Sequence, residues 1–155
     1  MPAERRQLAA AAFWSDENAG QEQAEVLAVV AQRIKFRPKS VIALPKAKKA
    51  QYLLGLPAVS ELVAARLLVA YHLAEQRPMM AAFLDALGIA HEDGLIADDE
   101  ITAPEPETLR KAAATLASAY PPDEVALYLS TLLWQDTETW GGLVDAPEAR
   151  LPGEA

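Results

Sequence analysis

Residues 58–76, AVSELVAARLLVAYHLAEQ, constrain the fold of this 155-residue chain most, because they are apolar nearly all the way round a helix. In a soluble protein such a helix must be covered on every side, which makes it the centre of a bundle. At about 100° per residue, Glu61 and His72 share one narrow polar stripe, whereas Arg66 points to nearly the opposite side. We therefore expect Arg66 to be largely buried and paired with a carboxylate of a neighbouring helix, with Asp85 as the nearest candidate in sequence.

The composition favours helices throughout. Alanine, the strongest helix former, accounts for 32 residues, and β-branched residues never gather into an alternating strand pattern. The sequence thus predicts an all-α, single-domain bundle of about six or seven helices around the central apolar helix 58–76. The helical domain is expected to cover residues 1–140. The glycine- and proline-rich residues 141–155 are expected to form a flexible C-terminal tail.

Proline and glycine mark the predicted helix ends, since proline is tolerated in a first turn and glycine suits the position after a last turn. Pro45 is expected to open a short helix that Gly55 ends, and Gly88 is expected to end the helix after the central one. The long segment 89–106 has no helical period and is expected to be a loop. Two amphipathic helices are predicted after it, one following Pro106 and one following Pro122.

Several classes of protein are excluded or disfavoured by residues that the chain lacks. Without cysteine there can be no disulfide and no thiolate metal site, so the reducing cytoplasm is the expected location. The longest apolar run, 62–74, is too short for a membrane span and contains two polar residues. No nucleophile elbow, zinc-protease helix or phosphate-binding glycine loop is present, so neither a catalytic residue nor a cofactor is predicted. The enzymatic alternative is an acid/base site near His72 and His91, the only two imidazoles.

The strongest anomaly is a basic segment, residues 33–49. No acid occurs between Glu25 and Glu61, and the local charge of +7 leaves −15 for the rest of a chain whose net charge is −8. As an anion- or partner-binding site, this segment would use all seven of its cations: Arg33, Lys35, Arg37, Lys39, Lys46, Lys48 and Lys49. Two other interpretations stay open, a solvated basic face and internal pairing with an acidic loop.

That acidic loop covers residues 92–107. It carries seven carboxylates, at positions 92, 93, 98, 99, 100, 105 and 107. Oxygen ligands on a loop suit calcium, but the EF-hand spacing is absent, and the last two glutamates are explained by the first turn of a helix. No metal site is therefore predicted here.

The most economical functional hypothesis is a non-enzymatic helical protein-interaction or adaptor domain that contacts a protein partner through the basic segment. Trp134 and Trp140 offer a second possible contact edge near the C-terminus, although closure of a small core explains such rings equally well. The alternative is binding of a polyanion, or of nucleic-acid phosphate, through the same cations. The acidic remainder of the chain weighs against extended contact with nucleic acid.

Overall fold

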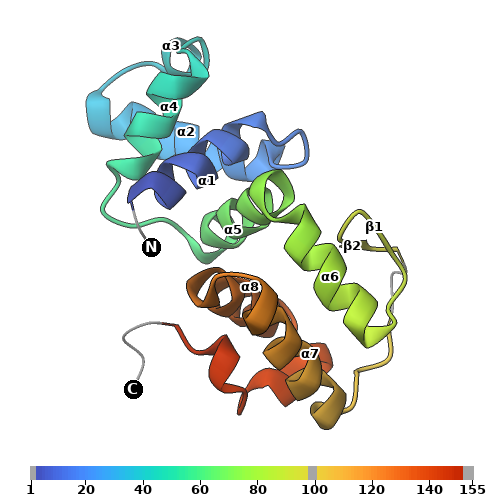
Figure 1. Ribbon diagram of the computed structural model, residues 1–155. Helices are drawn as coiled ribbons and strands as arrows, with labels where there is room; N and C mark the ends of the chain where they lie inside the picture. The colour runs from blue at the N-terminus through green and yellow to red at the C-terminus, as the bar shows by residue number, and fades with distance from the viewer. Residues whose placement is uncertain (1–2, 98–100, 152–155) are drawn as a thin grey trace. The chain divides into compact units, whose positions relative to one another are not determined.

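The computed structural model describes residues 3–97 and 101–151 and confirms the all-α class (Figure 1). In the described residues there are nine α-helices, two short 3-10 helices and one two-stranded hairpin. These elements form two compact units, residues 1–75 and residues 76–155. We describe each unit by itself.

Unit 1 contains the first five helices, coloured blue to green in Figure 1. They are α1 (Ala3–Ser15), α2 (Gly20–Ile34), α3 (Pro38–Ile42), α4 (Lys46–Leu54) and α5 (Glu61–Glu75). The apolar helix expected to be central, α5, packs against α1 and α2, and α1 also packs against α4. Side chains from all five helices form the core of the unit; its largest fully buried members are Phe13, Val26, Val30, Val41 and Val63.

Local chemistry sets the helix ends of unit 1. Pro38 occupies the first turn of α3 and Pro45 precedes α4, as their fixed φ angles favour. Lys35 ends α2 in the left-handed conformation at φ 58°, and its N–H bonds to the carbonyl of Ala31. The central helix begins at Glu61, later than predicted, because the Ser60 hydroxyl accepts a hydrogen bond from the Val63 N–H at 3.3 Å and so caps it.

Arg66 on α5 pairs with carboxylates, as expected, but not with the one predicted. Its guanidinium lies 3.8 Å from a Glu22 oxygen and 4.0 Å from an Asp16 oxygen, and 31% of its side chain stays exposed. The prediction of Asp85 was wrong, because Asp85 bonds instead to His91 at 2.7 Å. Both true partners are more than forty residues away in sequence, where no helical spacing could identify them.

Unit 2 contains α6 (Arg77–Leu87), β1 (His91–Glu92), β2 (Leu95–Ile96), α7 (Pro106–Ala119), α8 (Pro122–Gln135), α9 (Thr137–Trp140), and the 3-10 helices η1 (Gly141–Leu143) and η2 (Pro147–Ala149). α7 packs against α6 and α8, and the hairpin packs against α6. Phe83 is fully buried, with its ring 5.7 Å from the Tyr128 ring in an edge-on arrangement.

Residues 141–151 are the described part of the predicted tail. They form η1 and η2, which pack on α7 and α8, and bury Leu143, Ala146 and Ala149. Gly142 allows this close approach, because a Cβ there would lie 2.7 Å from the Leu109 side chain. Residues 152–155 lie outside the described part.

Candidate functional site

The basic segment runs along one stretch of unit 1, from the last turn of α2 through α3 to the first turn of α4 (Figure 1). Six of its seven cations have exposed side chains. We call these six the exposed cations: Arg33, Lys35, Arg37, Lys39, Lys46 and Lys48. None of them forms an ion pair with another residue in the described part of the chain.

The helix geometry does not account for these charges. Lys46 and Lys48 lie in the first turn of α4, where the positive end of the helix dipole disfavours cations by about 0.3–1 kcal/mol each. Lys35 holds a left-handed backbone conformation that glycine adopts at much lower cost. Lys46, Lys48 and Lys35 therefore each destabilise their helix end slightly, and no ion pair in the described residues offsets this cost.

Lys49 differs from the other cations of the basic segment. Its side chain is half-buried, and its ammonium lies 5.1 Å from the centroid of the Trp14 ring. The same ammonium donates to the carbonyl of Ile42 at 3.5 Å. A cation over an indole face is a stabilising contact, so Lys49 has a structural explanation that the exposed cations lack.

Two large apolar side chains are exposed within the basic segment. Phe36, between Lys35 and Arg37, is 51% exposed, and Ile42 in α3 is 55% exposed. Exposed aromatic and aliphatic groups among unpaired cations suit a ligand that combines negative charge with apolar surface.

Charge is divided unevenly between the two units. Residues 1–75 contain ten Lys and Arg against seven Asp and Glu, a net charge of +3. Residues 76–155 contain four against fifteen, a net charge of −11. The sequence contrast between the basic segment and the remainder is therefore also a contrast between folded units.

The acidic loop is only partly a loop. Glu92 lies in the hairpin, Asp93 occupies its turn, and Glu105 and Glu107 lie at the start of α7. Positions 98–100 are outside the described residues. Across the described ranges, no group of three His, Asp or Glu side chains has the geometry to hold a metal ion.

The two histidines belong to different units and have separate local partners. In unit 1, the Nδ1–H of His72 donates to the Leu68 carbonyl at 2.8 Å. Burial is the main cause of a pKa of His72 that is lowered from 6.5 to about 4. The hydrogen bond to Leu68 opposes this shift, and the nearby Arg5 charge makes a smaller contribution that lowers the pKa. In unit 2, His91 Nδ1 accepts from the Gly94 N–H at 3.1 Å, so its Nε2–H donates to Asp85.

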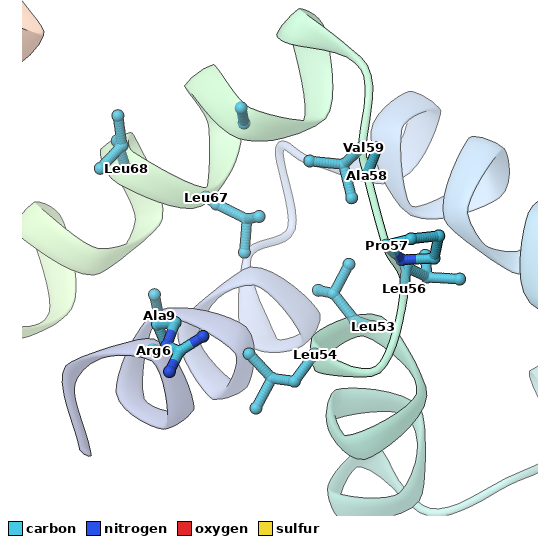
Figure 2. Close-up of a pocket in the computed structure, with 11 residues that line it drawn as sticks. Arg6, Ala9, Leu53, Leu54, Leu56, Pro57, Ala58, Val59, Leu67 and Leu68 are labelled. Carbon is cyan, nitrogen blue, oxygen red and sulfur yellow. The ribbon is translucent and has the colours of Figure 1, made fainter. Parts of the chain in front are cut away.

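A pocket of about 410 Å³ in unit 1 was not foreseen from the sequence (Figure 2). It lies between α1, α4, the connection 55–60 and α5, and its lining includes Leu53, Leu54, Val59 and Leu67. The available signal was the apolar run LLGLPAV, residues 53–59, which covers the end of α4 and most of the connection, since a surface loop has no need of so many apolar side chains.

Near the C-terminus the two tryptophans separate. Trp140 is buried in unit 2, as core closure predicts, whereas Trp134 is 47% exposed beside a smaller apolar hollow.

No helix in 3–97 or 101–151 has the length and apolar character to span a membrane. Comparisons with protein families, with curated proteins and with solved structures find no match to this chain.

Proposed function

We propose that this chain is a non-enzymatic interaction domain whose unit 1 binds an acidic, partly apolar segment of a protein partner. The observation that carries the proposal is the set of six exposed cations, none paired within the described residues, around exposed Phe36 and Ile42. Electrostatic attraction would bring the partner to this surface, and burial of the two apolar side chains would hold it there.

A protein segment fits this surface better than a nucleic acid does. The net charge of −8, with −11 in unit 2, repels an extended polyphosphate that reaches beyond the basic segment. A short acidic segment stays close to the exposed cations. Their attraction acts over about 8 Å at physiological ionic strength, because salt screens it at longer distances.

The second candidate function is binding of single-stranded nucleic acid. The observation that favours it is Phe36, whose exposed ring lies between two cations in sequence. Stacking of a base on such a ring is tolerant of sequence and strongly dependent on salt.

The experiment compares two double charge reversals that change the net charge equally. Lys46→Glu with Lys48→Glu alters the basic segment, whereas Arg110→Glu with Lys111→Glu alters exposed cations on α7 in unit 2. Fluorescence anisotropy would follow binding of three probes: a peptide alternating glutamate with leucine, polyglutamate, and single-stranded DNA. Circular dichroism would verify that both variants remain folded.

We expect the glutamate–leucine peptide to bind most tightly, because only this peptide carries both the negative charges that attract the exposed cations and the aliphatic side chains that cover Phe36 and Ile42. The Lys46/Lys48 reversal should weaken binding of the glutamate–leucine peptide at least tenfold, whereas the α7 reversal should leave that binding unchanged. Rising salt should weaken binding of the peptide to the wild type. Tighter binding of DNA than of either peptide would favour the second candidate. Equal effects of the two reversals would contradict a localised site altogether.

A further inference from the structure

The pocket in unit 1 has the size of a small-molecule site. Its volume of about 410 Å³ falls within the range of roughly 300–1,000 Å³ typical of ligand pockets. In Figure 2 the side chains of Leu53, Leu54, Val59 and Leu67 point toward a common space bounded on one side by α1. Three helices and one connection thus define its walls.

The lining is apolar with one exception. Ten of the eleven lining residues are Ala, Leu, Pro or Val, and the eleventh is Arg6 on α1. No Asp or Glu lines the pocket, and Arg6, which is exposed, has no ion-pair partner among the described residues. The pocket therefore presents one unpaired positive charge beside an apolar interior.

This combination specifies the chemistry of the ligand. A guanidinium binds a carboxylate through two parallel, charge-assisted hydrogen bonds, which are about twice as strong as hydrogen bonds between neutral groups, whereas a quaternary ammonium has no acceptor atom. The apolar walls favour an aliphatic chain, and Leu54 and Val59, 40% and 38% exposed, would lose water when the chain enters.

We infer that the unit 1 pocket binds an unbranched aliphatic carboxylate, with the carboxylate on Arg6 and the chain between Leu53 and Leu67. The inference does not depend on the proposed function of the basic segment. Arg6 lies outside that segment, and none of the exposed cations lines the pocket. Failure of either hypothesis leaves the other standing.

Isothermal titration calorimetry of the full chain with octanoate, decanoate and decyltrimethylammonium, each below its micellar concentration, tests this inference. Two additional methylenes should make decanoate bind roughly 15-fold more tightly than octanoate, at about 0.8 kcal/mol for each buried methylene. Decyltrimethylammonium, with the same chain and the opposite charge, should bind more weakly than decanoate. Methyl NMR shifts of Leu53 and Leu67 should follow the decanoate titration.

Variants separate the two parts of the site. Arg6→Gln should weaken decanoate at least tenfold while leaving the fold intact, because Arg6 is exposed. Arg110→Gln, an exposed arginine on α7, serves as the matched control and should leave decanoate binding unchanged. Ala64→Leu on α5 should fill the pocket and so block entry of the aliphatic chain of decanoate. Should that variant misfold, Ala58→Leu on the exposed connection should have the same effect.

Three results would overturn the inference. They are the absence of saturable decanoate binding, equal binding of decanoate and decyltrimethylammonium, and an Arg6→Gln variant that binds decanoate like the wild type. In those cases the pocket would instead accept apolar side chains of a macromolecular partner.

Discussion

The ammonium of Lys49 lies 5.1 Å from the centroid of the Trp14 ring, which joins α4 to α1 across the core of unit 1. Trp14 is only 6% exposed, so this cation sits against a ring that water barely reaches. Lys46 and Lys48, in the same turn of α4, remain exposed and unpaired within the described part. One short basic run therefore contains both a structural cation and free ones.

We expect Lys49→Ala to lower the free energy of unfolding by about 1 kcal/mol, since it removes the cation–π contact and the bond to the Ile42 carbonyl. Lys46→Ala should instead leave stability unchanged or raise it by about 0.3–1 kcal/mol, because it removes a cation from the first turn of a helix. Urea unfolding followed by tryptophan fluorescence measures both. Equal changes in the two variants would contradict the division of roles.

Burial of His72 makes the stability of unit 1 dependent on pH. The folded-state pKa of about 4 lies below the unfolded value of 6.5, so the unfolded chain binds the proton first as pH falls. The stabilisation from neutral His72 is complete above pH 6.5 and is lost between pH 6.5 and 4. The difference of about 2.5 pKa units corresponds to roughly 3 kcal/mol.

The variant His72→Gln isolates this effect, because its amide can still donate to the Leu68 carbonyl but does not titrate. Between pH 7 and pH 4 the wild type should lose roughly 3 kcal/mol more unfolding free energy than the variant. Urea unfolding at a series of pH values gives the comparison, and an NMR titration of the His72 imidazole gives the pKa directly. A midpoint near 6.5 would refute the buried, neutral state.

The helical elements were largely predictable because their signals are local. Pro45 and Gly55 bound α4 as expected, and Gly88 ends α6 in the left-handed conformation at φ 70°. The apolar spacing of α7 was likewise informative, since Leu109 and Leu116 are both buried. Each of these signals depends on backbone sterics or on burial of one helix face.

The features that the sequence did not predict depend on contacts between distant residues, or on a two-residue turn inside a longer irregular segment. The carboxylate partners of Arg66 depend on how α5 packs against α2, and sequence proximity wrongly favoured Asp85. The Asp93–Gly94 pair is a strong hairpin signal within a segment predicted to be a loop. The apolar run 53–59 alone did not reveal the pocket, because the lining spans positions 6–68 and apolar residues there fit a filled core equally well.

The Arg66 cluster gives a prediction about salt. Arg66→Leu keeps an apolar stem but removes the charge facing Asp16 and Glu22, whose side chains are only 12% and 14% exposed. Because Arg66 itself is partly hydrated, we expect a loss of about 1 kcal/mol at low salt. The loss should shrink in 1 M NaCl, where charges are screened over about 3 Å.

The control for Arg66 is Arg33→Leu, at an exposed arginine without an ion pair in the described residues. Its effect on unfolding free energy should stay within about 0.5 kcal/mol at either salt concentration. Arg66→Glu should destabilise more than Arg66→Leu, because it places a third carboxylate beside Asp16 and Glu22. A stabilising Arg66→Glu substitution would show that the cluster does not need its cation.

Gly94 gives the sharpest test of the hairpin, because two independent constraints require glycine there. Its φ of 90° is strained for any other residue, and a Cβ would lie 2.9 Å from the Met80 Cβ and 3.1 Å from the Arg77 carbonyl oxygen. Gly94→Ala should therefore displace the turn from α6 and lower the unfolding free energy by about 1–3 kcal/mol. It should also loosen the hydrogen bond from the Gly94 N–H to His91, which NMR hydrogen exchange at that amide would detect.

Gly20→Ala, where a Cβ meets nothing within 4 Å, is the matched control and should not destabilise the chain. Similar losses in the two variants would show that the close approach of Gly94 to α6 does not constrain the fold.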